Sequence, residues 1–222
     1  MIKNGVFILS LDRSFSTSTY EHVADTLNKL NLDDNCKAVV LTGATKVFSA
    51  GHDLTCTDEP PITKMMNSVM NFSKPLIAAV NGPAIGIGCT ILGWCDIVYS
   101  IKTAFFEMPF LRIGIIPEFG CRYTMLGRSN LNEMLYFGKR QSAQIMFERG
   151  FVCRLFDTYD EMLADIRTSL RDVSTREMQV YKKLIQHPDR AGLWAAAVKQ
   201  EKNLVSGIIH DNLSFDEILS KL

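Results

Sequence analysis

Two short apolar runs, each followed by a glycine-rich segment, place the strongest constraint on how this chain can fold. Residues 38–42 precede the segment Phe48-Ser49-Ala50-Gly51-His52-Asp53. Leu76–Val80 precedes the segment Asn81-Gly82-Pro83-Ala84-Ile85-Gly86-Ile87-Gly88. Short apolar runs bounded by turn residues are typical of buried strands. The apolar stretch at residues 89–94 then predicts a buried helix directly after the second glycine segment.

A strand, a tight glycine turn and a helix start together leave backbone N–H groups without an intrahelical partner. Two such turns that lie side by side can direct two N–H groups at a single oxygen atom, and this arrangement stabilises an oxyanion. The sequence therefore indicates chemistry at a carbonyl group whose oxygen becomes negatively charged.

Strands and helices alternate over the first two-thirds of the chain. Apolar runs predict strands at Val6–Leu11, 38–42, Leu76–Val80, 95–100 and 151–156. Helical patterns fall at residues 19–32, 63–72, 121–126, 131–137, 143–149, 160–173, 176–185, 192–207 and 211–221. We therefore predict an α/β core over residues 1–156 and a C-terminal helical region over residues 157–222.

The composition excludes several classes of partner. Lysine plus arginine (24) balances aspartate plus glutamate (24), so no basic field indicates a nucleic-acid partner. The N-terminus enters a strand-like run without a signal-peptide core, and no apolar run is long enough to span a bilayer. The six cysteines include no C-x-x-C pair, which favours reduced thiols, and no cluster has the spacing of metal ligands.

The first glycine segment also contains the residue types of a serine-hydrolase triad in Ser49, His52 and Asp53. Neighbours on one turn cannot line up nucleophile, base and orienting group, and the chain has no G-x-S-x-G motif. This alternative is therefore disfavoured. We expect Asp53 to hold the turn through local backbone hydrogen bonds.

Three segments in order, residues 47–54, 74–86 and 95–100, resemble the crotonase (enoyl-CoA hydratase/isomerase) superfamily. The resemblance covers roughly residues 6–156. It implies a spiral core of repeated ββα units, a fatty enoyl-CoA thioester as ligand, no separate cofactor, and a homotrimer or a dimer of trimers. It also implies an oxyanion hole made by the backbone N–H groups of Ala50 and Ile87. The residues implied to contact the substrate or its coenzyme A part are Ser49, Ala50, Gly51, His52, Asp53, Leu54 and Gly86.

The acidic residues decide which reaction of this superfamily is expected. The two positions that carry glutamate in the hydratases are occupied here by Thr90 and Phe110, so the pair of carboxylates that hydration uses is missing. Glu118 remains, in a Pro-Glu pair that looks like the peroxisomal Δ3,Δ2-enoyl-CoA isomerase branch. The resemblance implies that Glu118 is a single catalytic base, which moves a cis or trans 3-double bond to the trans-2 position during oxidation of unsaturated fatty acids.

The loop after the first strand departs from the family pattern. Residues 12–17 lack the proline and asparagine that crotonases usually carry after the first strand, so Arg13 is only a candidate phosphate partner there. An enoyl-CoA hydratase, a dienoyl-CoA isomerase and a non-catalytic acyl-CoA-binding protein remain as alternatives. Turnover of 3-hexenoyl-CoA compared with a 2-enoyl-CoA distinguishes the isomerase, the hydratase and the binding protein.

The chain ends in Ser220-Lys221-Leu222, the tripeptide that the peroxisomal import receptor reads at an extreme C-terminus. This ending predicts the import receptor as a partner and the matrix of a peroxisome or a glycosome as the location.

Overall fold

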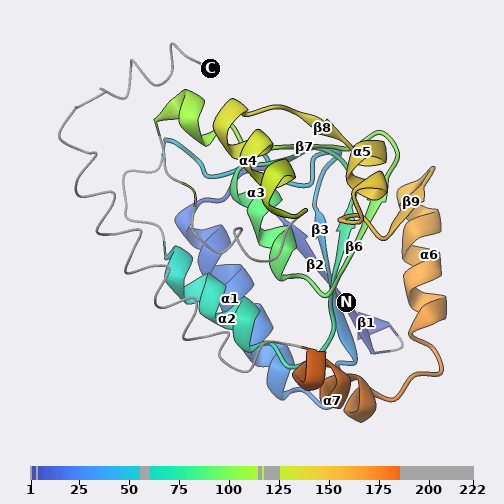
Figure 1. The fold of residues 1–222 in the computed structure, drawn as a ribbon. Coiled ribbons are helices and arrows are strands. Elements are labelled where there is room, and N and C mark those ends of the chain that lie inside the picture. The colour runs from blue at the N-terminus through green and yellow to red at the C-terminus, as the bar shows by residue number, and fades with distance from the viewer. Residues whose placement is uncertain (1, 4, 56–60, 115–116, 118–125, 186–222) are drawn as a thin grey trace.

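A six-stranded sheet runs through the centre of the molecule (Figure 1). The computed structural model describes residues 2–3, 5–55, 61–114, 117 and 126–185. The strand order is β1-β2-β3-β4-β6-β9, and every pair is parallel except β1 with β2. The strands of this sheet are β1 (Ile2–Lys3), β2 (Val6–Leu11), β3 (Ala38–Gly43), β4 (Leu76–Val80), β6 (Ile97–Ile101) and β9 (Arg154–Phe156). The α/β class expected from the alternating pattern is thus confirmed.

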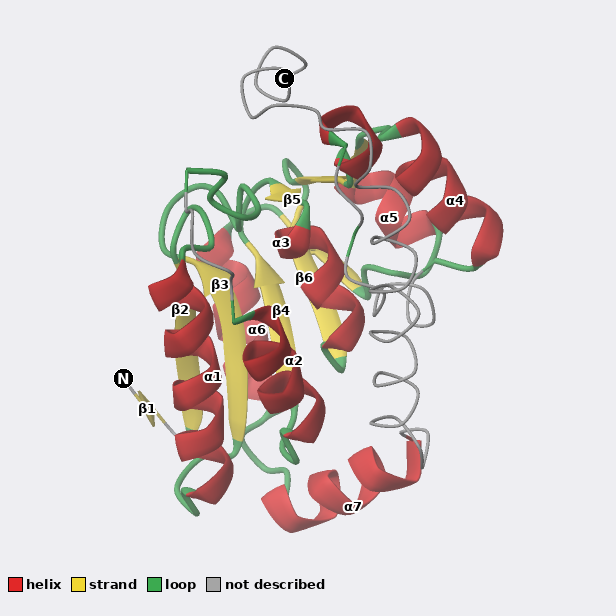
Figure 2. Cartoon of the chain, turned by 90° about the vertical axis from the view of Figure 1, so that its left-hand side faces the viewer, coloured by secondary structure: helices red, strands yellow, loops and turns green. Residues whose placement is uncertain are grey.

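Both faces of the sheet are buried, which explains why its strands are apolar without alternation. Val39 and Leu41 of β3 belong to a core cluster with helices α1 (Thr17–Leu32) and α2 (Ile62–Asn71). Val40 lies on the opposite face, in a second cluster with helix α6 (Tyr159–Ser169). Figures 1 and 2 show α1 and α2 together on one side of the sheet and α6 on the other.

Helix α6 begins at a capping box, in which Thr158 and Glu161 satisfy each other's backbone N–H groups. Its buried residues Met162 and Ile166 belong to the second core cluster, and the helix contacts strands β4, β6 and β9. The packed core therefore continues past residue 156, where the sequence pattern placed the end of the core.

A second, three-stranded sheet lies beyond the ends of the central strands and carries short helices. Its order is β5-β7-β8, with strands β5 (Ala84–Ile85), β7 (Phe105–Glu107) and β8 (Gln141–Ser142). The helices of this region are α3 (Ile87–Thr90), η1 (Ile91–Trp94), η2 (Phe110–Ile113), α4 (Arg128–Phe137) and α5 (Ala143–Glu148). The helices expected at residues 89–94, 131–137 and 143–149 appear here as α3 with η1, α4 and α5. The three strands are too short to give a periodic signal, and the sequence did not predict them.

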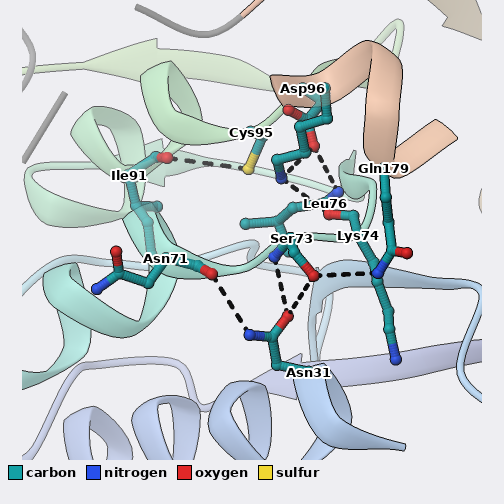
Figure 3. A network of polar contacts seen from close by, with 10 residues as sticks. Asn31, Asn71, Ser73, Lys74, Leu76, Ile91, Cys95, Asp96 and Gln179 are labelled. Atoms are coloured by element: carbon teal, nitrogen blue, oxygen red, sulfur yellow. Dashed lines mark hydrogen bonds and ion pairs between the residues drawn. The ribbon is translucent and has the colours of Figure 1, made fainter. Parts of the chain in front are cut away.

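Helix α7 (Thr175–Ile185) is fastened to the start of strands β4 and β6 by a polar network (Figure 3). The Lys182 ammonium contacts Asp96 Oδ2 at 2.7 Å and donates to the Lys74 carbonyl. The same Asp96 oxygen accepts the Leu76 N–H at 2.7 Å. Gln179 of α7 adds a hydrogen bond to Ser73. This network joins segments 86 to 108 residues apart in the sequence.

Within the described residues, no helix combines the length and the apolar character that crossing a membrane requires. The helices expected at residues 192–207 and 211–221 lie outside the described residues, as does all of the one expected at residues 121–126 except its last residue.

Candidate active site

The two glycine segments lie side by side beyond the ends of β3 and β4, as the sequence predicted. Ser49 forms a parallel bridge with Ala84. The Ser49 N–H donates to the Pro83 carbonyl at 3.1 Å, and the Ile85 N–H donates to the Ser49 carbonyl at 2.9 Å. The Asn81 side chain adds hydrogen bonds to both backbone groups of Gly43. Backbone groups of both turns therefore come within reach of one small volume.

This close approach depends on glycine at particular positions. A Cβ on Gly88 would lie 2.5 Å from the Ser49 Cβ, closer than side-chain atoms approach. Gly51 has a φ of +97°, in the region that favours glycine, and a Cβ there would lie 3.3 Å from the Ile85 carbonyl oxygen. The packing of one turn on the other thus explains why these positions lack side chains.

The direction of each N–H in the first segment decides which can meet a ligand. The Ala50 N–H donates to the Arg13 carbonyl at 2.6 Å, so it is already engaged in the structure. Phe15 forms a parallel bridge with His52 by bonding the Gly51 carbonyl and the Asp53 N–H. In a parallel bridge of this pattern, the middle residue points its own N–H and C=O away from the partner.

The His52 N–H is consequently the amide of the first segment that faces away from Phe15. Among the residues that the structure describes, none accepts a hydrogen bond from it. The geometry therefore does not support Ala50 as an oxyanion donor and favours His52, two residues further on. The sequence could not show this, because the register of the Arg13–Phe15 backbone against the first glycine segment exists only in the folded chain.

The second segment supplies the other amide. The Gly86 N–H donates to the Glu107 carbonyl at 3.0 Å, and Cys89 and Thr90 donate back to Gly86. The Ile87 N–H has no acceptor within the part of the chain that the structure describes. Ile87 thus keeps a donor available for a ligand oxygen at the position where the family resemblance implies one.

Helix α1 contacts the His52 side chain through Tyr20. Tyr20 is fully buried, and its hydroxyl lies 3.3 Å from His52 Nδ1 with the two rings 5.9 Å apart. Asp53 accepts hydrogen bonds from the Thr55 hydroxyl at 2.6 Å and from the Thr55 N–H at 3.0 Å, as expected for a turn aspartate. The bond from the Thr55 hydroxyl, aided by the backbone bond, lowers the pKa of Asp53.

Neither hydratase position carries an acid or a free base. Thr90 is buried, and its hydroxyl donates to the Ile87 carbonyl at 3.4 Å. Phe110 is buried beside the second turn, 4.0 Å from where a Cβ of Gly86 would lie. The Ser49 hydroxyl accepts the Gly51 N–H at 3.1 Å. It is fully buried, which disfavours the hydrolase alternative.

The sequence analysis missed one buried carboxylate next to the turns. Glu107 is 8% exposed and lies between Arg140 Nε at 3.0 Å and Arg112 Nη1 at 3.4 Å. Both arginines engage this carboxylate in ion pairs, so its role is structural and not that of a base.

Within the described residues, no group of three histidine, cysteine or acidic side chains could hold a metal ion. Glu118 and the tripeptide at residues 220–222 lie outside the described residues, and so does most of the segment around Glu118.

The comparisons with known proteins agree with this architecture. The family described as "Enoyl-CoA hydratase/isomerase" matches residues 1–213. Rat "Enoyl-CoA delta isomerase 2" is 32% identical over 195 residues, which cover 79% of this chain and 49% of that protein. Mouse "Enoyl-CoA delta isomerase 3, peroxisomal" is 29% identical over 185 residues, or 75% of this chain and 58% of that protein. A crystal structure of an enoyl-CoA hydratase/isomerase from Pseudoalteromonas atlantica superposes with a TM-score of 0.87 at 27% identity, covering 99% of this chain and 94% of that one.

The chain therefore belongs to the enoyl-CoA hydratase/isomerase family and has the crotonase fold. It spans about half the length of the rat isomerase that it matches. The family resemblance noted on the three sequence segments is confirmed.

Proposed function

We propose that this protein is a Δ3,Δ2-enoyl-CoA isomerase that moves the 3-double bond of a fatty enoyl-CoA to the trans-2 position. The observation that carries the proposal is the pair of backbone amides, His52 and Ile87, on adjoining glycine turns without acceptors among the described residues. The similarity to relatives named enoyl-CoA delta isomerase supports the same reaction.

In the proposed mechanism, the thioester oxygen accepts hydrogen bonds from the His52 and Ile87 amides. These bonds stabilise the negative charge that the oxygen acquires when a proton leaves C2, and one such donor is worth on the order of 10²–10³ in rate. Asp53 and the Gly51 turn hold the first donor, and the second turn holds the other. His52 thus replaces Ala50 as the proposed first donor, while Ile87 is retained.

Glu118 is the proposed proton shuttle. It takes a proton from C2 and returns it to C4, while the double bond moves from C3–C4 to C2–C3. One carboxylate is enough because no water is added. The missing acids at Thr90 and Phe110 support isomerisation over hydration. Coenzyme A belongs to the substrate, and we propose no further cofactor or metal.

Substrate turnover tests the reaction. Purified protein should convert 3-hexenoyl-CoA to the conjugated thioester and should not hydrate a 2-enoyl-CoA. Replacing Glu118 by Gln should lower kcat by about 10²–10⁴ while thioester binding persists. Hydration of the 2-enoyl-CoA would instead identify a hydratase, and binding without any turnover would identify an acyl-CoA-binding protein. A 3,5-dienoyl-CoA tests the dienoyl-CoA isomerase alternative.

Amide chemical shifts test the choice of donors separately. Saturated hexanoyl-CoA has the same thioester but no double bond to move. On its addition to ¹⁵N-labelled protein, the amide protons of His52 and Ile87 should shift downfield, because each gains a hydrogen bond to the thioester oxygen. The Ala50 amide should stay in place, because its bond to Arg13 persists. A shift of Ala50 with His52 unmoved would favour Ala50 as the donor.

We further propose that Ser220-Lys221-Leu222 directs the chain to the matrix of a peroxisome or a glycosome through the import receptor. The peroxisomal name of one relative supports this location. A fluorescent fusion that keeps these three residues at its C-terminus should enter the organelle, and a fusion lacking Leu222 should not.

A homotrimer or a dimer of trimers is the proposed assembly. Light scattering of the purified protein measures its mass and tests this proposal.

A further inference from the structure

Phe110 packs next to the turn that carries the second proposed donor. It begins helix η2, is 7% exposed, and places its Cε1 atom 4.0 Å from where a Cβ of Gly86 would lie. Gly86 directly precedes Ile87, whose amide is the second proposed donor. An aromatic ring therefore packs against the turn at the position where the resemblance to hydratases places a carboxylate.

Ion pairs around the buried Glu107 carboxylate, with two half-exposed arginines, connect helix η2 to its surroundings. Glu107 contacts Arg112, on the same η2 helix as Phe110, and also Arg140 from the other side. Arg112 donates through its second nitrogen to the Phe137 carbonyl at the end of α4. The Arg140 guanidinium stacks on the Phe105 ring, 3.8 Å from its centre. These contacts join η2, α4 and strand β7 into one unit.

Glu107 also holds the second glycine turn in place through its backbone. The Glu107 carbonyl accepts the Gly86 N–H at 3.0 Å, and Glu107 pairs with Ile85 in the β5–β7 ladder. The backbone of Glu107 thus fixes the turn, while its side chain fixes the helix that carries Phe110. Glu107 is 8% exposed, and its carboxylate is paired with two guanidinium groups. Charge-assisted hydrogen bonds of this kind are directional, so they fix the position of helix η2 relative to the turn.

We infer that Phe110 is a specificity-determining residue that keeps water away from the bound thioester, and that Glu107 is the positioning residue that holds it there through Arg112. The inference rests on the proposed function. With water excluded, the proton taken from C2 remains on the base until it returns to C4, so the reaction ends in isomerisation and no water is consumed.

Turnover in deuterium oxide tests this directly, because a shielded proton is returned before it exchanges with solvent. Phe110→Ala should raise the deuterium incorporated at C4 of the product by about threefold or more and should lower kcat by roughly tenfold, with little change in KM. Leu111→Ala is the matched control, since Leu111 lies on the same η2 helix and is 61% exposed. It should leave both quantities unchanged.

Glu107→Gln should move deuterium incorporation in the same direction as Phe110→Ala. Glu133→Gln is its control, because Glu133 also contacts two cations, Lys139 and Arg149, but lies on α4 and is more exposed. A role of Glu107 in stability alone would lower the melting temperature without changing the isotope content of the product. Equal isotope content in Phe110→Ala, Leu111→Ala and wild type would overturn the inference.

Amide exchange with hexanoyl-CoA bound separates this inference from the proposed function. The peptide containing Ile87 should exchange faster in Phe110→Ala than in Leu111→Ala, whether or not the protein isomerises a substrate. If hexanoyl-CoA binds but no isomerase activity is found, the proposed reaction is wrong and the exchange rates still decide the role of Phe110. Equal exchange rates, or failure of the wild type to bind the thioester, would overturn the shielding role.

Discussion

The two ends of the central sheet differ in how their polar groups are paired. Beyond the ends of β3 and β4, the His52 and Ile87 amides point away from the backbone bonds around them and find no acceptor among the described residues. At the start of β4 and β6, Asp96 joins Lys182 to the Leu76 N–H (Figure 3). Lys74 donates to the carbonyls of Leu30 and Asp33.

Under the proposed function, this difference separates an end of the sheet that binds a ligand from an end that stabilises the fold. An unpaired amide lowers stability, since a buried donor without a partner loses its bond to water. In the proposed mechanism, the thioester oxygen supplies the missing partner. The opposite end has no such use for open donors, and its charged groups hold helix α7 in place. Substitutions at the two ends should therefore separate activity from stability.

The largest effect on activity is expected from Gly88→Ala at the site end. The new Cβ would lie 2.5 Å from the Ser49 Cβ, so the two turns must move apart. Displacement of the donors by about 1 Å should lower kcat/KM by about 10²-fold. The overpacking should also lower the free energy of unfolding by about 1–3 kcal/mol. Steady-state kinetics and urea unfolding measure the two effects.

Gly150→Ala provides the control for backbone strain. Gly150 has a φ of +77°, lies between α5 and β9, and has no atom within 4 Å of where a Cβ would lie. Its substitution should cost roughly 1 kcal/mol of stability and leave kcat/KM unchanged. Equal losses of activity in Gly88→Ala and Gly150→Ala would show that general destabilisation, and not turn geometry, limits activity.

Asp96→Asn at the opposite end should give the reverse pattern. The Lys182 side chain is 6% exposed and would lose its carboxylate partner, so the free energy of unfolding should fall by about 2 kcal/mol. For a chain of this size, that corresponds to a melting temperature about 4–8 °C lower. The kcat of the folded protein should not change, because the network lies at the far end of the sheet.

The exposed pair Lys102–Asp157 is the comparison for this prediction, with both side chains more than half exposed at the same 2.7 Å separation. Asp157→Asn should alter stability by less than about 0.5 kcal/mol. A large drop in kcat for Asp96→Asn, measured well below its melting temperature, would contradict the separation of roles between the two ends.

The smallest effect is expected at Asp53, where the hydrogen bond from the Thr55 hydroxyl lowers the carboxyl pKa. Thr55→Val removes that bond and should move the pKa of Asp53 up towards its ordinary value of 3.8. A lowered pKa stabilises the fold above the unfolded-state pKa, and this contribution disappears as the pH falls through the folded-state pKa. The wild type should thus exceed the variant in stability above about pH 4, with the difference vanishing in stronger acid.

Carboxyl ¹³C titration of Asp53 in both proteins measures the shift directly. Glu133 is a reference within each sample, because its pKa is lowered by Lys139 and should not respond to Thr55→Val. An unchanged Asp53 titration in the variant would show that the Thr55 N–H alone sets the pKa.

Much of the fold could be predicted from local patterns. The apolar runs of β2, β3 and β4 end at turn residues, so their existence and bounds were evident, and the helical periodicity of α1, α2 and α7 gave those helices to within a few residues. Strands β5, β7 and β8 could not be predicted, since two or three residues carry no periodic signal. They form because the folded chain brings their edges together.

The candidate site divides in the same way. The glycine segments identified the turns, and Ile87 has an amide without an acceptor in the described part of the chain. Ala50 was expected to be the other donor, but sequence shows only that a turn exists and not which way each peptide group points. The bridge between Phe15 and His52 determines that direction. Glu107 was overlooked, since Arg140 becomes its neighbour only when β8 pairs with β7.

By itself, the sequence determined the family, the two adjoining turns and the absence of acids at Thr90 and Phe110, because these depend on which residue types occupy which positions. The tertiary structure decided which amides have no acceptor among the described residues. It also decided that the Phe110 ring packs against the second turn and that Asp96 and Lys182 hold α7 in place. Hydrogen-bond direction and contacts between distant segments depend on strand register and helix packing. Those properties arise only when the whole chain buries its core.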